Sequence, residues 1–170
     1  YEAVELDVAV AVVEGVLGAD HPDTLTARSN LVGAYDSVGH FAEAIDAGEK
    51  LLPDCQRVLG PDHLVTLAAR NNLASAYGNV GRFGEAIDAW EELLPDCQRV
   101  LGADHPDTLT VRNNLALAYK SVGRFGEAIE LFEQVLAESE RVLGADHPDT
   151  LTVRNNLAVA YYSAGRLAEA

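Results

Sequence analysis

Four histidines recur at a constant spacing and raise the question of a metal site. His21, His63, His105 and His147 lie 42 residues apart, each just before a segment with helical spacing of its apolar residues. Metal ligands must converge to within about 2 Å of one ion, which equivalent residues of successive repeats cannot do. We therefore predict that the histidines are turn residues beside helix starts, and we expect no metal.

Arginines recur in the same way and could bind an anion. Arg70, Arg112 and Arg154 share one position of the repeat, and Arg28 precedes them there. The alternative is structural: the aliphatic stems cover the seam between two helices, and the guanidinium groups pair with nearby carboxylates. We favour the structural interpretation.

Patterns typical of catalysis are missing from the sequence. It contains no nucleophile elbow, no glycine-rich phosphate loop and no HExxH pair. The Asp and Glu side chains fall on solvated helix faces, with no apolar pocket that would shift a pKa. We predict that the protein is not an enzyme and uses no cofactor.

The two cysteines, Cys55 and Cys97, occupy the same position of successive repeats, and Ser139 takes this position in the next one. A disulfide requires Cα atoms within about 7 Å, whereas equivalent points on stacked helix pairs lie roughly 10 Å or more apart. We expect free thiols on helices, and a reducing cytoplasmic location.

Composition limits the class of partner. The 170 residues carry a net charge of −15, which disfavours nucleic acid and anionic membrane surfaces. The longest apolar run, Val8 to Val13, is too short to span a bilayer, and no signal-peptide pattern precedes it. Because the chain lacks methionine and stops at Ala170 within a continuing pattern, we interpret it as a piece of a longer protein.

These residues belong to an internal repeat. The segment "GADHPDTLTVRNNLALAYKSVG" at 102–123 returns as "GADHPDTLTVRNNLAVAYYSAG" at 144–165, with related segments at 18–39 and 60–81. A regular period of 42 residues predicts a solenoid in which each repeat packs on its neighbours. We predict a single array over 1–170 with these bounds: a degenerate second helix at 1–17, repeats at 18–59, 60–101 and 102–143, and a truncated repeat at 144–170.

The sequence of each repeat predicts two helices, helix A followed by helix B, and no strand. In repeat 102–143, Pro106 suits the first turn of helix A and Gly123 its left-handed end. Helix B then runs from near Phe125 to Leu143, about 19 residues against about 16 for helix A. Apolar residues at spacings of three and four place one face of each helix in a core.

Prolines interrupt two of the B helices. Pro53 and Pro95 each remove a backbone hydrogen bond in a helix interior, where the third repeat has Ala137. We predict a kink or break in the first two B helices and a straighter third one. The alternative is a loop at "LLPDC" followed by a separate short helix over "CQRVL".

The blocks "NNLA.AY..VGRFGEAI" resemble tetratricopeptide repeats of the 42-residue variety found in kinesin light chains and many bacterial proteins. Leu73, Ala74, Tyr77, Gly81 and Phe83 fall on that family's spacing of large, small, aromatic and turn residues. The resemblance implies an all-α fold of helix-turn-helix repeats stacked into a right-handed superhelical solenoid. The "GADHPDTL" turns also resemble the sensor regions of large bacterial signalling ATPases.

Two features depart from the family pattern. Arginine stands in helix A where the family often has a large apolar residue. Gly48 replaces the Trp90 and Phe132 of later repeats, so we expect looser packing there.

The resemblance also implies that helix A lines a concave surface and helix B a convex one. The acidic residues of the B helices then lie on the convex face and serve solubility. Carried over position by position, the concave wall comprises Ser29, Gly33, Asp36 and Ser37, then Asn71, Ser75, Gly78 and Asn79, then Asn113, Leu117, Lys120 and Ser121, then Asn155, Val159, Tyr162 and Ser163.

Asparagines at one position of this wall could hold a peptide. A carboxamide both donates and accepts, so Asn71, Asn113 and Asn155 could pair with the backbone of an extended segment, or they could be merely solvated. Their sequence neighbours are assigned a structural role, bonding an adjacent helix or turn. The neighbours are Asn30, Asn72, Asn114 and Asn156.

The leading hypothesis is a scaffold that binds a peptide or protein segment on the concave face, within a larger bacterial signalling or regulatory protein. Its binding residues would be Asn71, Asn113, Asn155, Ser75, Asn79, Leu117, Lys120, Val159 and Tyr162. The alternative is a structural module that forms homo-oligomers by end-to-end stacking, because repeat arrays without polar caps expose apolar ends. Enzyme activity is a remote third hypothesis.

Overall fold

The structure is a computed structural model that describes residues 2–165, with side chains from residue 5 onward. Within these residues it contains no strand, and no helix is long and apolar enough to cross a membrane. The helices are α1 (Glu2–Leu17), α2 (Pro22–Ser37), α3 (Phe41–Val58), α4 (Leu64–Asn79), α5 (Phe83–Val100), α6 (Pro106–Ser121), α7 (Phe125–Leu143) and α8 (Pro148–Ser163).

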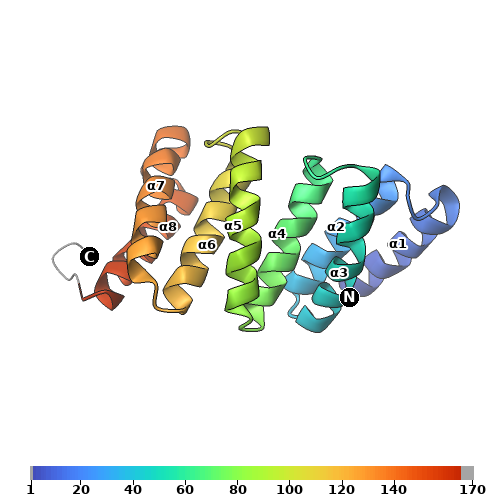
Figure 1. The fold of residues 1–170 in the computed structure, drawn as a ribbon, viewed down its shortest axis with the longest axis horizontal. Coiled ribbons are helices and arrows are strands. Elements are labelled where there is room, and N and C mark those ends of the chain that lie inside the picture. The colour runs from blue at the N-terminus through green and yellow to red at the C-terminus, as the bar shows by residue number, and fades with distance from the viewer. Residues whose placement is uncertain (1, 166–170) are drawn as a thin grey trace. The chain divides into compact units, whose positions relative to one another are not determined.

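The chain divides into two compact parts, unit 1 at residues 1–89 and unit 2 at residues 90–170. In unit 1, α1 packs on α2, α2 on α3 and α3 on α4, and α2 also packs on α4 (Figure 1). In unit 2, α6 packs on α7 and α7 on α8. The helices A are α2, α4, α6 and α8, and the helices B alternate with them.

Helix A begins at a histidine cap. In α6, the Nδ1 atom of His105 accepts the backbone N–H of Asp107 at 3.2 Å, and Pro106 takes the first helical position. His21, His63 and His147 cap their helices in the same way at 3.2 Å. The prediction that these histidines are turn residues beside helix starts is confirmed, and their role as caps is an additional finding.

Glycines end the helices. Gly123 follows α6 with φ +82°, as predicted, and Gly39 and Gly81 follow α2 and α4 with φ +82° and +80°. Only glycine adopts this left-handed conformation without steric cost, so the turn to helix B is fixed locally.

The B helices continue through their prolines. α3 and α5 are each 18 residues long with Pro53 and Pro95 inside them, and α7 has the expected 19 residues. The predicted break, and the alternative of a separate helix after a loop, are therefore wrong; the kink stays a prediction. Leu51 and Cys55, on either side of Pro53, are both fully buried, and their packing holds the helix on both sides of the proline.

The core of unit 1 contains Leu25, Val32, Leu51 and Cys55. Gly48 is buried beside it, and a Cβ atom there would lie 3.0 Å from Cδ1 of Leu73. The expectation of looser packing at Gly48 is therefore wrong, because Leu73 fills the space that a larger side chain would need. Cys55 and Cys97 are buried thiols that form no disulfide, as expected, and burial raises the pKa of the Cys55 thiol.

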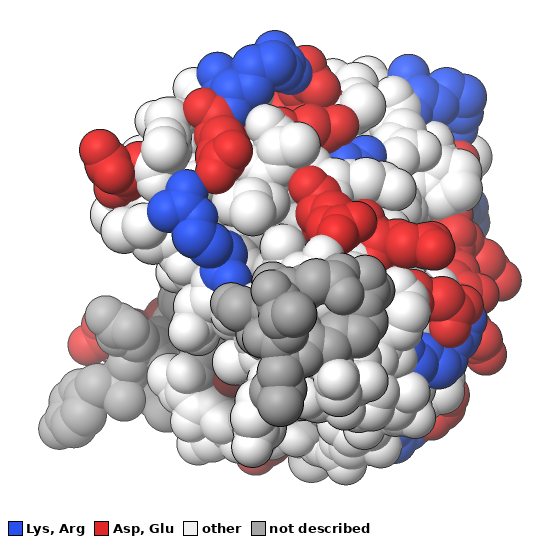
Figure 2. Space-filling model, turned by 90° about the vertical axis from the view of Figure 1, so that its left-hand side faces the viewer, with Lys and Arg blue, Asp and Glu red and all other residues white. Residues whose placement is uncertain are grey.

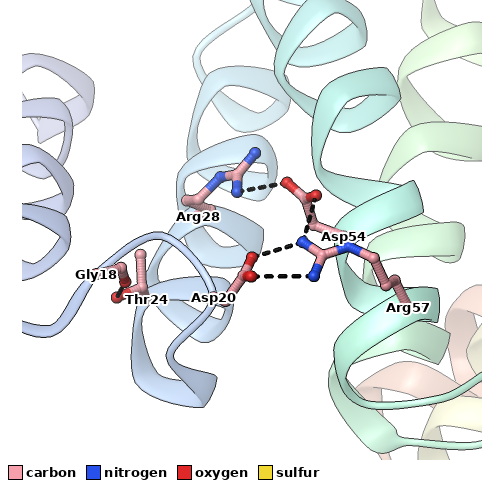
Figure 3. Close-up of polar contacts among 6 residues, drawn as sticks. All are labelled: Gly18, Asp20, Thr24, Arg28, Asp54 and Arg57. Atoms are coloured by element: carbon pink, nitrogen blue, oxygen red, sulfur yellow. Dashed lines mark hydrogen bonds and ion pairs between the residues drawn. The ribbon is translucent and has the colours of Figure 1, made fainter.

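Ion pairs join α2 to α3 and α6 to α7, each a helix A and the helix B that follows it. In unit 1, Arg28 donates to Asp54 at 2.9 Å, and Arg57 pairs with both Asp54 and Asp20 (Figure 3). Hydrogen bonds from these arginines hold the pKa values of Asp20 and Asp54 below their usual range.

Two further arginines form ion pairs between helices in unit 2, Arg112 with the helix B that follows it and Arg154 with the helix B that precedes it. The buried Arg112 donates to Glu138 at 2.7 Å, and Arg154 pairs with Glu140 at 2.7 Å. The structural interpretation is thus confirmed for Arg28, Arg112 and Arg154.

Candidate protein-binding surface

The nine residues proposed from the sequence lie on three helices A. They share one stripe of each helix, because they follow one another at spacings of three or four residues. Helix α4 carries Asn71, Ser75 and Asn79 in unit 1; in unit 2, α6 carries Asn113, Leu117 and Lys120, and α8 carries Asn155, Val159 and Tyr162.

In unit 1 this stripe is largely occupied by internal hydrogen bonds. Asp36 of α2 accepts Ser75 Oγ at 2.9 Å and Asn79 Nδ2 at 2.8 Å, so one carboxylate bridges α2 and α4. These polar groups are already satisfied within the protein. A partner would have to displace them to form new hydrogen bonds, which reduces the net gain.

A second polar contact supports the same helix pair. Asn72 Nδ2 donates to the carbonyl oxygen of Ser29 at 3.1 Å, which confirms the structural role expected for Asn72. Ser29 is only 4% exposed. Its expected place in the concave wall is therefore wrong, because Asn72 and α4 lie against it.

In unit 2 the equivalent positions have different chemistry. The positions of Asp36, Ser75 and Asn79 are occupied two repeats later by Lys120, Val159 and Ser163. Val159 is 42% exposed and Tyr162 is 68% exposed, while Leu117 is half-buried. Helices α6 and α8 touch at few points, in contrast to α2 and α4. Unit 2 therefore offers an apolar and cationic surface where unit 1 offers a closed bridge.

The three asparagines of the proposed ladder are not equivalent. Asn155 is exposed, whereas Asn71 and Asn113 are half-buried. The Oδ1 atom of Asn113 is shielded from solvent and accepts no hydrogen bond from any residue in the described range 2–165. Only Asn155 has the open environment that a continuous ladder would need at every step.

Tyrosine–glutamate pairs were missed by the sequence analysis. Tyr77 donates to Glu49 at 2.8 Å and Tyr119 donates to Glu91 at 2.7 Å, and Tyr161 makes the same bond to Glu133. The only sequence signal is a separation of 28 residues. Each bond joins a helix A to the helix B of the preceding repeat, so these glutamates do more than increase solubility.

Arginine completes two of these pairs. The Arg82 guanidinium lies 4.3 Å from the ring centre of Tyr77, and that of Arg124 lies 4.1 Å from the ring centre of Tyr119. Burial and the hydrogen bond to glutamate raise the pKa values of Tyr77 and Tyr119 to about 12.

The acidic side chains of the B helices are exposed. Figure 2, viewed towards the end formed by α7 and α8, shows Asp and Glu gathered along one side and mostly uncharged surface beside them. This distribution separates the excess negative charge from the stripe on helices A. The exposed acids of the B helices include Glu43, Asp46, Glu49, Glu85, Asp88, Glu91, Glu92, Glu127, Glu130, Glu133 and Glu140.

Comparison with known proteins identifies relatives that have the same architecture. Family models described as tetratricopeptide repeat match residues 66–138, 114–170 and 24–64. Two crystal structures of a putative kinesin light chain with nearly identical TPR-like repeats, from Podosopora anserina, are similar to this chain. Each is 32% identical to it in sequence. Both matches cover 98% of this chain and 79% of the kinesin light chain in the crystal, with TM-scores of 0.83 and 0.81.

A third solved structure is more distant. BtubC (BKLC) from P. vanneervenii is 26% identical with a TM-score of 0.79, over 88% of this chain and 60% of that one. No curated protein matches this chain.

Proposed function

Because the chain belongs to the tetratricopeptide repeat family, whose members mediate protein–protein interaction or act as scaffolds, we propose that it binds a segment of a partner protein along helices A. In the family this is the concave face. The partner is an extended peptide or a helix, and its main contacts are Leu117, Lys120, Val159 and Tyr162 of unit 2.

One observation carries this proposal. Val159 and Tyr162 are apolar or aromatic, lie on one stripe and are exposed, with Lys120 on the facing helix. Tyrosine supplies a large contact area at low entropic cost, and such side chains often dominate binding energy. Asn71, Asn113, Asn155, Ser75 and Asn79 extend the proposed surface, but Ser75 and Asn79 already have partners.

Matched variants test the proposal. We would capture partners from the source lysate with wild type, with Val159→Ser/Tyr162→Ala, and with the unit 1 control Glu43→Ala, an exposed residue of α3 outside the proposed surface. We expect partners, identified by mass spectrometry, to be lost only from the unit 2 variant, with helicity retained in all three. Equal capture by all three proteins would contradict the proposed surface.

The same proposal includes the setting of the protein. The "GADHPDTL" repeats favour a role within a larger bacterial signalling or regulatory protein. Two buried thiols that form no disulfide are consistent with a reducing cytoplasm.

Self-assembly is a second candidate, favoured by one feature of α1. Val8, Val12 and Val16 fall on one face at spacings of four residues and are all exposed. Such a stripe could pack on a helix of a second copy. Sedimentation over a concentration series, with Val8→Glu/Val12→Glu as the control, tests this; a wild type that stays monomeric at the highest concentration would exclude it.

A further inference from the structure

Unit 2 contains a pocket of about 340 Å³ between α6, the last turns of α7 and the first turns of α8. Its apolar lining includes Leu109, Val135, Leu143 and Val153, and its polar lining includes Asn113 and Asp149. All these residues belong to one compact unit.

The corresponding place in unit 1 shows why a pocket forms in unit 2. There Val65 packs against the core together with Val58 and Leu59. Two repeats later Val65 corresponds to Asp149, which cannot pack in the same way because its carboxylate stays in water. Val142 and Leu143, the equivalents of Val58 and Leu59, are consequently 45% and 41% exposed.

Asp149 brings a negative charge without a compensating cation. Its carboxylate lies 3.7 Å from Nδ1 of His147, but that nitrogen is already used as the acceptor of the backbone N–H of Asp149. Among the described residues, no Lys or Arg lies within ion-pair distance of Asp149. The other acid of the lining, Asp104, is already paired with Arg141.

Asn113 adds an acceptor. Asn113 is a lining residue, and its solvent-shielded Oδ1 atom accepts no hydrogen bond from the described residues, so a small rotation of the amide would open an acceptor to the pocket. A buried acceptor without a donor is unfavourable, and a donor supplied by a ligand would relieve that cost. The pocket thus combines an apolar lining, one uncompensated carboxylate and one unused acceptor.

We propose that this pocket receives the side chain of an arginine or lysine of the partner protein. The aliphatic stem packs on Val142 and Leu143, the exposed part of the apolar lining, and the cationic head pairs with Asp149 and offers an N–H to Asn113. An anionic residue would be repelled, and an uncharged apolar one would form no ion pair with Asp149, whose side chain is 79% exposed, and would leave the amide oxygen without a donor. The inference rests on the proposed function, because the partner would lie along the same helices A.

The test uses a minimal probe and a matched pair of variants. We would titrate acetyl-Gly-Arg-Gly-amide into the isotope-labelled protein and follow its amide resonances by NMR. We expect saturable shifts at Thr110, Val142, Leu143 and Thr152. The neutral citrulline peptide should bind at least about tenfold more weakly.

Asp149→Asn should weaken binding of the arginine peptide by about tenfold, because it removes the charge and keeps the shape. Asp146→Asn, an exposed acid of the same turn outside the lining, should leave binding unchanged. Equal binding by both variants, equal binding of the citrulline peptide, or shifts spread over the acidic B helices would overturn the proposal.

The two hypotheses fail separately. If Val159→Ser/Tyr162→Ala loses the partner while the arginine peptide does not bind, the proposed function stands and the basic-residue pocket fails. If the peptide binds at Asp149 and the partner is captured equally by all variants, the pocket stands as a cation site and the proposed surface fails.

Discussion

A single histidine prepares the start of each helix A. Its ring nitrogen satisfies one of the backbone N–H groups that a helix leaves without an internal partner. The usual capping residues are Ser, Thr, Asp and Asn, so the use of histidine here was not expected from the sequence. The repeated sequence "DHP" therefore encodes a cap followed by a proline that is pre-set for the first turn.

We expect His63→Ala to lower the free energy of unfolding by about 1 kcal/mol, because the N–H of Val65 loses its acceptor. His63→Asn should restore most of this loss, since asparagine accepts the same bond. Urea denaturation of the three proteins measures the effect. An asparagine variant as unstable as the alanine variant would show that the cap contributes nothing.

The tyrosine–glutamate pairs make stability depend on alkaline pH. The pKa of Tyr119 is raised to about 12 in the folded protein, against about 10 for a free tyrosine. The neutral phenol is therefore favoured by folding, and its contribution is complete below about pH 10 and lost as the pH rises through about 12.

Ultraviolet titration of phenolate in wild type and Tyr119→Phe checks this. We expect the substitution to remove an absorbance step near pH 12. If the substitution instead removes an absorbance step near pH 10, the hydrogen bond to Glu91 does not favour the neutral form of Tyr119.

At the scale of elements, local signals were sufficient for most helix bounds. Pro106 and Gly123 mark the start and end of one helix through conformations that depend on a single residue. The bridge from Asp36 to Ser75 and Asn79 could not be predicted, because it joins residues about forty positions apart and depends on how closely two helices approach. The pocket at Asp149 was missed for the same reason.

The prolines show tertiary packing overriding a local rule. Buried Leu51 and Cys55 hold α3 together although Pro53 removes a backbone bond between them. We expect Pro53→Ala, which copies Ala137 of the third repeat, to raise the free energy of unfolding by about 1–3 kcal/mol.

The reciprocal change, Ala137→Pro, should destabilise by about 3 kcal/mol, measured in the same urea series. If Pro53→Ala leaves the free energy of unfolding unchanged, the backbone hydrogen bond that is missing at Pro53 does not destabilise α3.

At the scale of the whole molecule, an excess of acid is confined largely to exposed positions on the B helices. With a net charge of −15, mutual repulsion should exceed the attraction within the ion pairs. We expect the melting temperature to rise by several degrees between about 20 mM and about 300 mM NaCl, where the Debye length becomes shorter than the spacing of the charges. A falling melting temperature would mean that the ion pairs dominate.

The separation of charge from the helix A stripe also explains how an acidic repeat protein can present an apolar and cationic contact surface. Val159, Tyr162 and Lys120 lie on α6 and α8, whereas the acids of unit 2 are mostly on α5 and α7. The central claim is that a partner protein lies against this stripe.

Site-specific photo-crosslinking tests that claim most directly. A photoreactive phenylalanine analogue would replace Tyr162 in one protein and Glu130, an exposed residue of α7, in another. We predict a crosslinked partner at position 162 and none at position 130. A partner captured at 130 but not at 162 would contradict the account and place recognition on the acidic B helices.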